Sequence, residues 1–556
     1  MKSKWVRVLV YLMVGCVVLA GTGYGAYRGY KSWRQHRFVK QAKEFLEEGQ
    51  ERKAMISLQR AVRAKPTDVE AIRLLATMAE KDRSPAAVVW RQRVVDLEPD
   101  SLTDRLALAQ TAISFRDTAS ATNALAGVND AGRKTVEFQN VAGGVASVLG
   151  QLEEAERYFL DASRLEPENP VMLLNLAVVR LQGTNTQALA EARQALEGIT
   201  ATSTNSALRC RAYRELVGHA MRIGQTNNAI ALTDRLLAEP EVAFGDRLLR
   251  LDVLGMNRST NLVEELMSTR ALATNSVGTV NQMIIWQMTR VPPRPTLEWV
   301  GSLPAEYRTN AGVALMTADL QVAVQDWEGL NTSLEAQTWG EMEFLRHAFR
   351  TLAMRNLGLT GAAEIEWGLT MRATGSDRGA LNMLLQAVAR WRWVDEIREI
   401  LTALVNRYPG EKWAASLLTQ NLFNEGRTRS LMSLFGTQLS ANPNDLSIKN
   451  NLAMTAMLLE ANELRPHEMA RQVYEAAPTN ASFASTFAYS LHVREQSAEA
   501  LRVMEQLAPE QLEQPSIAAY FALILRANGR DEQARRYREL AAEGKFLPEE
   551  RRVLGL

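Results

Sequence analysis

Residues 143–167 read GGVASVLGQLEEAERYFLDASRLEP, and residues 41–66 read QAKEFLEEGQERKAMISLQRAVRAKP. In both stretches a small residue is followed by glycine, alanine, a large apolar residue, alanine and proline at the same offsets. Glycine suits a helix C-terminus because it adopts left-handed backbone angles, and proline ends a helix because it lacks an N–H. The pattern therefore predicts two helices, A and B, joined by a tight turn at Gly49 or Gly150.

The small residue of helix A recurs along the chain with a step close to 34, and a fixed step of this size indicates stacked copies of one unit. A single hairpin cannot bury its own apolar face, so neighbouring copies must complete the core. We expect roughly fifteen hairpins. The residues expected to pack the hairpins or to form their turns are Ala42, Gly49, Ala54, Ala76, Gly143, Gly150, Ala155, Ala177, Ala453, Ala488, Ala522, Gly529 and Ala534.

These stretches resemble the tetratricopeptide repeat, a helix–turn–helix of about 34 residues. The resemblance implies an all-α fold, a right-handed α-solenoid whose concave groove is lined by the A helices and binds other proteins or peptides. In the family, an asparagine two residues before the small position often bonds a ligand backbone. Asn175 and Asn451 occupy that position here, and the alternative is that they are ordinary exposed helix residues.

The marks of the repeat fade between residues 241 and 380, where Pro292, Pro293, Pro295 and Pro304 are expected to interrupt helices. We therefore divide the chain into four segments. They are an N-terminal anchor or signal peptide at 1–35, a repeat block at 36–240, degenerate helical repeats at 241–380, and a second repeat block with a capping helix at 381–556.

Residues 8–27 carry no charged side chain. As a helix they would span about 30 Å, the thickness of the hydrocarbon layer of a membrane. Aromatic residues lie near both ends of this stretch, as they do in membrane-spanning helices. An uncleaved transmembrane helix is therefore predicted, with a cleaved signal peptide or a lipobox at Cys16 as the alternatives.

The three glycines Gly21, Gly25 and Gly29 are spaced four residues apart, which permits close packing of two membrane helices and hence a homodimer. The orientation of the helix is ambiguous. The excess of basic residues after residue 27 favours a cytoplasmic solenoid. A short basic N-terminus before an apolar run is instead typical of a secretory signal, so we expect the solenoid to be periplasmic, on the inner membrane.

Charge and chemistry-bearing residues exclude several classes of function. The 64 basic and 63 acidic residues balance, so no overall field attracts nucleic acid. The cysteines Cys16 and Cys210 do not form a disulfide framework, and the five histidines lack metal-ligand spacing. We identify no catalytic, cofactor-binding or metal-binding motif, and we interpret Trp327 and Trp393 as packing residues.

The expected function is therefore that of a non-enzymatic, membrane-anchored scaffold for protein–protein interactions in a cell-envelope export or biogenesis complex. The alternative is a subunit or regulator of an enzyme complex, such as a polysaccharide-synthesis or proteolysis adaptor. In that case any catalytic site would lie in residues 241–380.

Overall fold

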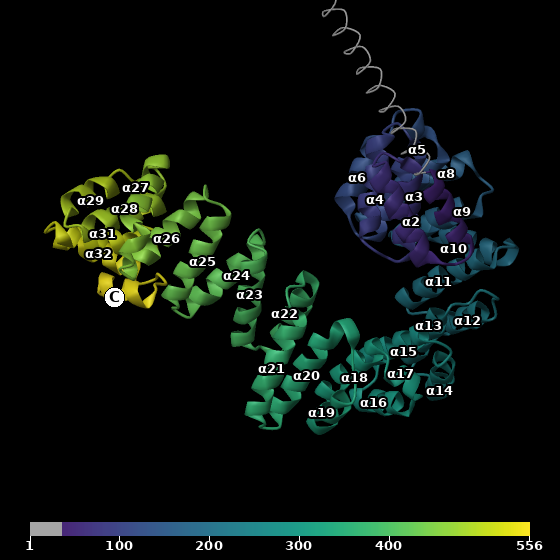
Figure 1. The fold of residues 1–556 in the computed structure, drawn as a ribbon. Helices are drawn as coiled ribbons and strands as arrows, with labels where there is room; N and C mark the ends of the chain where they lie inside the picture. Colours follow the sequence, from purple (N-terminus) through teal and green to yellow (C-terminus); the bar gives the residue numbers. More distant parts are fainter. Residues whose placement is uncertain (1–35) are drawn as a thin grey trace, which may run out of the picture. The chain divides into compact units, whose positions relative to one another are not determined.

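The computed structural model describes residues 36–556, and every regular element in this range is a helix (Figure 1). The predicted span at 8–27 and its glycines lie outside the described residues. Between residues 36 and 556, no helix has both the length and the apolar character needed to cross a bilayer. The chain forms two compact units that divide between Met283 and Ile284, within α15. The segment boundaries at 240 and 380 stay predictions.

Unit 1 starts with helical residues 36–47. It continues through α2 (Glu51–Ala64), α3 (Val69–Lys81), α4 (Ala86–Leu97), α5 (Leu102–Ser114), α6 (Thr118–Ala126), η1 (Gly132–Lys134), α7 (Val136–Val148), α8 (Leu152–Leu165), α9 (Pro170–Arg180), α10 (Thr186–Thr202), α11 (Ser206–Arg222), α12 (Thr226–Leu237), α13 (Phe244–Met256), α14 (Leu262–Ala273) and the first part of α15 (Val277–Arg290).

Unit 2 contains the end of α15, followed by α16 (Pro293–Ser302), α17 (Ala305–Arg308), α18 (Ala311–Ala323), α19 (Trp327–Glu335), η2 (Gly340–Met342), α20 (Glu343–Asn356), α21 (Thr360–Thr374), α22 (Arg378–Trp391), α23 (Val394–Arg407), α24 (Lys412–Asn424), α25 (Thr428–Ala441), α26 (Leu446–Leu458), η3 (Asn462–Leu464), α27 (Pro466–Ala476), α28 (Ala481–Val493), α29 (Ser497–Met504), α30 (Pro509–Leu512), α31 (Pro515–Ala527), α32 (Asp531–Ala541) and α33 (Pro548–Leu554).

The longer helices form fifteen successive A–B pairs between residues 36 and 541, as the repeat spacing predicts. The 3-10 turns and the four-residue helices α17 and α30 lie in the connections between pairs. The prediction that Pro292, Pro293, Pro295 and Pro304 interrupt helices holds for Pro292 and Pro304, which lie between helices, and is wrong for Pro293 and Pro295. Pro292 and Pro304 are the N-caps of α16 and α17, while Pro293 and Pro295 lie in the first turn of α16, where the missing N–H costs no hydrogen bond.

A left-handed residue just after helix A closes the A–B turn in thirteen of the fifteen pairs, the exceptions being α9–α10 and α15–α16; the α26–α27 connection contains a second one, Arg465. Six of these residues are glycines, including Gly49, Gly150 and Gly529 with φ of +71°, +75° and +74°, as the sequence predicts. The other seven carry side chains, and these residues are Arg83, Arg116, Arg258, Gln325, Arg392, Glu460 and Glu495. The repeat therefore continues through the stretch where the glycine signal is lost.

The small residues of the A helices are buried against the following B helix. Ala42, Ala76, Ala177, Ala453 and Ala488 are each at most 2% exposed. Gly143 is buried on α7, and the nearest atoms to a Cβ built there belong to the Phe159 ring, at 2.8–2.9 Å. The absence of a side chain at this position thus lets the α8 aromatic ring lie directly on the α7 backbone.

Gly143→Ala is therefore expected to destabilise the α7–α8 hairpin by about 1–3 kcal/mol, because Phe159 must move to admit the methyl group. The adjacent Gly144 is a matched control, since a Cβ there meets no atom within 4 Å. Gly144→Ala should be neutral or stabilise the helix by up to about 1 kcal/mol. Hydrogen exchange of α7 and α8 measures both effects, and equal responses would contradict the packing described.

Two ion pairs with the same repeat positions join consecutive A helices of unit 1. Arg73 on α3 pairs with Asp104 on α5, and Arg214 on α11 pairs with Asp246 on α13, at 2.6 and 2.5 Å. The hydrogen bond to Arg73 lowers the pKa of the buried Asp104 carboxyl. Each arginine is ten residues before the left-handed turn residue, so the repeat register also places the charges.

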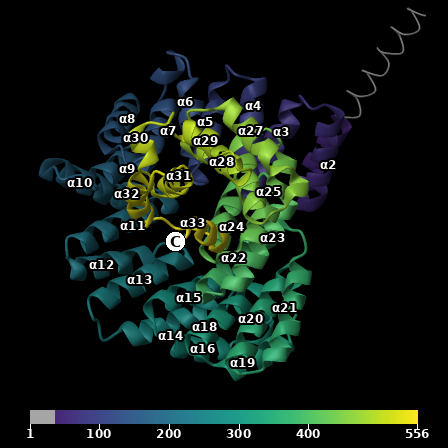
Figure 2. The same ribbon diagram turned by 90° about the vertical axis from the view of Figure 1, so that its left-hand side faces the viewer.

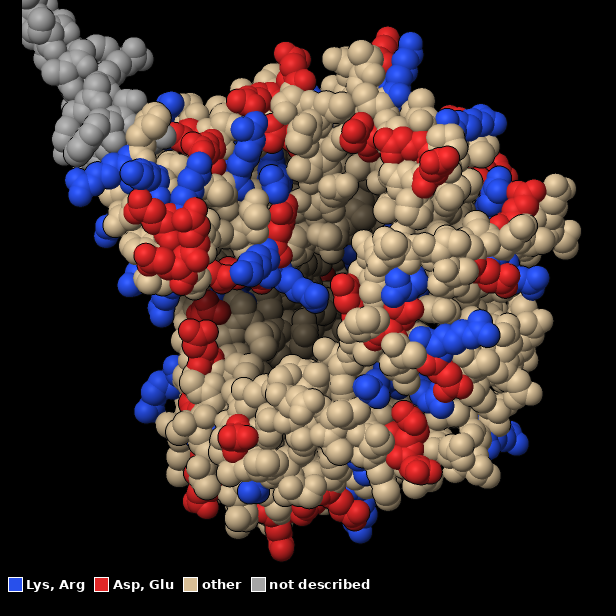
Figure 3. Space-filling model, turned by 90° about the vertical axis from the view of Figure 1, so that its right-hand side faces the viewer, with Lys and Arg blue, Asp and Glu red and all other residues tan. Residues whose placement is uncertain are grey.

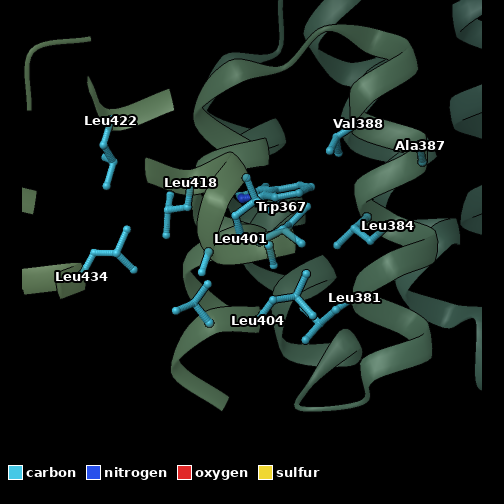
Figure 4. Close-up of a cluster of buried hydrophobic side chains, with 14 of the residues drawn as sticks. Trp367, Leu381, Leu384, Ala387, Val388, Leu401, Leu404, Leu418, Leu422 and Leu434 are labelled. Carbon is cyan, nitrogen blue, oxygen red and sulfur yellow. The ribbon is translucent and has the colours of Figure 1, made fainter. Parts of the chain in front are cut away.

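The core of unit 2 is built around aromatic rings from several hairpins. Phe349 is fully buried and contacts Trp339 and Trp391 with ring centroids 6.3 and 5.2 Å apart. Trp393 contacts Trp391 and Trp367. Figure 4 shows the Trp367 side chain among leucines of α22 to α25. The interpretation of Trp393 as a packing residue is confirmed, and Trp327 packs against the same core.

Candidate interaction groove

A groove of about 370 Å³ runs over the A helices α5, α7, α9 and α11 of unit 1. Its lining combines exposed and half-buried positions of these A helices with buried valines that also belong to the core, and with Phe159 of the B helix α8. The lining consists of Gln110, Ile113, Asn140, Val141, Gly144, Val145, Ser147, Val148, Phe159, Asn175, Val178, Val179 and Arg211. The groove therefore combines a valine-rich surface with amide and guanidinium groups.

Three polar side chains form a row across successive A helices in this groove. The Nδ2 of Asn175 donates to Oδ1 of Asn140 at 2.7 Å, and its Oδ1 accepts from Arg211 at 3.0 Å. An amide has two N–H donors and an oxygen with two lone pairs. Asn175 therefore keeps one unused N–H donor and one unused lone pair. These can bond to the C=O and the N–H of a peptide backbone.

The apolar part of the groove is open to solvent. Val148 is 53% exposed at the C-terminal end of α7, and Gly144 lies one turn before it with open space around its Cβ position. Ile113 and Val178 on the neighbouring A helices are half-buried. Exposed apolar surface of this kind, beside hydrogen-bonding groups that are fixed in place, is characteristic of a binding site.

The structure separates the two asparagines that the sequence predicts as contact residues. Asn175 lies at the centre of the groove, whereas Asn451 lies exposed on α26 in unit 2, and its carbonyl accepts from Thr455. Sequence reasoning did not find Asn140 and Arg211. They are 35 residues before and 36 after Asn175, and only the stacking of helices shows that their side chains meet.

Residues 335–366 contain a cluster of charged side chains, in the region where the alternative reading would place a catalytic site. Glu366 is 4% exposed and contacts His347 Nδ1 at 2.6 Å and Arg350 at 3.4 Å. Glu343 pairs with Arg346 at 2.5 Å. Glu366 on α21 is thus held by side chains of α20, so the cluster joins α20 to α21.

Other titratable groups are dispersed. Between residues 36 and 556, no group of three or more His, Cys, Asp or Glu side chains is arranged to hold a metal ion. Burial raises the pKa of the Cys210 thiol, which disfavours the reactive thiolate. On the face drawn in Figure 3, basic and acidic residues are interspersed, which agrees with the balanced composition.

No family model and no curated protein matches the chain. Several solved structures are similar to it. The type IV pilus biogenesis factor PilW has 15% identity, a TM-score of 0.28, and coverage of 44% of this chain and 94% of that one. A tetratricopeptide repeat protein from Parabacteroides merdae has 13% identity and a TM-score of 0.25, with coverage of 61% of this chain and 99% of that one. A chain of the APC/C hetero-tetramer Cut9–Hcn1 has 12% identity and a TM-score of 0.27, with coverage of 91% of this chain and 98% of that one.

With TM-scores below 0.5, these similarities add nothing to what the hairpins of the chain itself establish. The repeat step near 34, the paired helices and the left-handed turn residue are properties of this chain. By these properties the chain resembles the tetratricopeptide repeat proteins.

Proposed function

We propose that the protein is a non-catalytic scaffold that binds a segment of a partner protein in the groove of unit 1. The observation that carries the proposal is the Asn140–Asn175–Arg211 row beside a valine-rich surface with Val148 exposed, across four consecutive A helices. An amide row binds the backbone of a peptide, and the valines bury its apolar side chains. The partner segment is therefore extended and mixed apolar and polar, without a large net charge.

Site-specific photo-crosslinking tests this proposal in cells that contain the full chain. A photoreactive residue at Val148 lies in the groove, whereas one at Val263 is an exposed control on the B helix α14. We expect a discrete adduct from position 148 and none of the same mass from position 263. Gly144→Leu, which places a side chain into open groove space, should abolish the adduct while leaving the protein folded.

Equal crosslinking from both positions, or an adduct that survives Gly144→Leu, would contradict binding in this groove. Asn175→Ala is a second test, because it removes the row but leaves the apolar surface intact. We expect it to weaken the adduct about tenfold, since two hydrogen-bonded neighbours then lose their partner.

The proposal includes attachment to the inner membrane through residues 8–27, a right-handed solenoid on the periplasmic side, and a role in a cell-envelope assembly. Support comes from the uncharged stretch of membrane-spanning length and its aromatic flanks. Alkaline phosphatase fused after Leu556 tests the orientation: an active fusion supports a periplasmic solenoid, and a stable but inactive fusion contradicts it. A homodimer through Gly21, Gly25 and Gly29 is a further part of the proposal.

A further inference from the structure

The last helix of the chain, α33, does not continue the stack of hairpins but folds back onto earlier ones (Figure 2). Its first residue, Pro548, lies against the α24–α25 turn, where a Cβ built on Gly426 would be 2.8 Å from the Pro548 ring. Thr428, at the start of α25, donates a hydrogen bond to Glu549. These contacts join residues about 120 positions apart within unit 2.

The other side of α33 faces the last hairpins. The Tyr520 hydroxyl on α31 donates to Oε1 of Glu550 at 2.6 Å, and Tyr489 on α28 contacts the Tyr520 ring at a centroid distance of 5.3 Å. Leu547 is 4% exposed and belongs to the core of unit 2. Arg538 on α32 donates to the carbonyl of Gly555 at 2.6 Å, which fixes the end of the segment.

The repeat register identifies the surface that α33 covers. Tyr520 is two residues before the small residue Ala522, and Asn175 is two residues before Ala177. Tyr520 thus occupies, in unit 2, the helix position that Asn175 occupies in the open groove of unit 1. The segment 547–556 consequently covers in unit 2 the face of the A helices that is available for binding in unit 1.

Several features indicate that this contact can open. A seven-residue helix is too short to be stable alone, so α33 is helical only while docked. No residue of α33 is buried as a whole, although the Glu550 carboxyl is shielded from solvent; Leu547, which precedes the helix, supplies the fully buried anchor. Residues 543–546, which connect it to α32, are not helical. Release therefore exposes the tyrosines at the cost of the Leu547 anchor and of the hydrogen bonds to Thr428, Tyr520 and Arg538.

We propose that residues 547–556 are a displaceable intramolecular ligand of the unit 2 groove, which takes a short amphipathic helix beginning Leu-Pro-Glu-Glu. The leucine fills the apolar core, proline starts the helix against Gly426, and the two carboxylates accept from Thr428 and Tyr520. A partner helix with this chemistry competes with the tail, so the second groove is closed until such a helix displaces it. This inference concerns a different groove from the one in the proposed function.

A labelled peptide of residues 544–556, GKFLPEERRVLGL, is the probe. We expect it to bind the chain that lacks residues 546–556 at least tenfold more tightly than the intact chain, whose groove is occupied. Glu550→Ala in the peptide, or Tyr520→Phe in the truncated chain, should weaken binding about tenfold. Equal binding to the intact and truncated chains, or affinity unaffected by both substitutions, would overturn the proposal.

Hydrogen exchange on the intact chain provides a test that needs no truncation. The Arg551 and Leu556 amides donate to Leu547 and Arg551 in the docked segment. We expect both amides to exchange at least tenfold more slowly than in the free peptide, and Glu550→Ala in the intact chain to remove this protection. Exchange at the free-peptide rate in the unmodified chain would overturn the proposal.

The docking should also depend on pH. Burial raises the pKa of Glu550, and the charged groups around it, Glu549 on its own segment and Glu460 near Tyr489, are carboxylates too. Desolvation likewise raises the pKa of Tyr489 to about 12, and it raises the pKa of Tyr520 well above its ordinary value. Both phenols therefore stay protonated around neutral pH.

Because the docked state favours protonated Glu550, docking tightens as the pH falls through its raised pKa. The gain is complete below the ordinary carboxyl value of 4.5 and is lost as the pH rises through the raised value. We expect the peptide to bind the truncated chain more tightly at pH 5 than at pH 8, with a smaller dependence for the Glu550→Gln peptide. Identical pH profiles for the two peptides would contradict the burial of this carboxyl on docking.

Discussion

Phe349→Ala is expected to lower the free energy of opening of the α20–α22 region by about 3–5 kcal/mol, the range for removal of a fully buried phenylalanine. The ring lies between Trp339 and Trp391, so its loss leaves a cavity that two rigid indoles cannot fill by small movements. The edge-to-face contact with Trp391 is also lost, and such a contact is worth about 0.5–1.5 kcal/mol beyond the buried area.

The effect should extend beyond one hairpin, because the rings connect successive repeats. Trp391 contacts Trp393, and the Arg355 guanidinium lies 4.0 Å from the centroid of the Trp393 ring while pairing with Glu396 at 2.5 Å. In a solenoid the stability of each repeat depends on its interfaces with its neighbours. We therefore expect faster exchange throughout α20 to α23, and little change in unit 1.

Hydrogen exchange resolved by segment is the appropriate measurement, since a long repeat array need not unfold in a single step. Trp413→Ala is the matched control. Trp413 is 45% exposed on α24, and its indole N–H donates to Glu411 two residues away. Its removal should change stability by less than about 1 kcal/mol. A response to Phe349→Ala as small as this would contradict the description of the aromatic core.

The hairpins could be predicted from sequence because each repeats the same local demands. Some positions of each hairpin admit few residue types, because the backbone or the packing there is restrictive. They are occupied by glycine at 49 and 150, by alanine at 54 and 155, and by proline after helix B. The degenerate middle was harder to assign because proline starts helices as well as ending them. At Pro293 only the observed helix boundary shows that the proline is an N-terminal residue.

The candidate groove could be predicted only in part. Asn175 has a register position that marks the inner face of helix A, whereas Asn140 and Arg211 gain their significance from contacts across two neighbouring repeats. The docking of α33 could not be predicted from the sequence for the same reason. Nothing local in LPEERRVLGL indicates that Glu550 meets Tyr520, since that contact requires the curvature of several stacked hairpins.

At seven A–B turns the residue present does not favour the left-handed backbone conformation that the repeat requires. Seven hairpin turns hold a residue with a side chain at φ of +50° to +64°, a conformation that costs such residues roughly 1 kcal/mol relative to glycine. All seven are exposed, so their side chains contribute little packing. At these positions the repeat imposes the left-handed backbone conformation, although the residue present disfavours it.

Replacing six of them together by glycine is expected to stabilise the protein by about 3–6 kcal/mol in total, at about 0.5–1 kcal/mol per turn. The positions are Arg83, Arg116, Arg258, Gln325, Arg392 and Glu495. They are at least 33 residues apart and lie in different hairpins, so their effects should add. Denaturant unfolding of the combined variant, with each unit followed by hydrogen exchange, measures the gain.

Two control substitutions should both destabilise the protein, in contrast to the stabilisation expected for the combined variant. Arg60→Gly, at an exposed position inside α2, should destabilise by about 1 kcal/mol, because glycine there only adds freedom to the unfolded chain. Gly150→Ala should also destabilise by about 1 kcal/mol, because φ of +75° then strains a Cβ that meets no other atom within 4 Å. A combined variant no more stable than the parent would mean that the left-handed turns cost these side chains nothing. In that case backbone conformation would not explain why glycine recurs at this position.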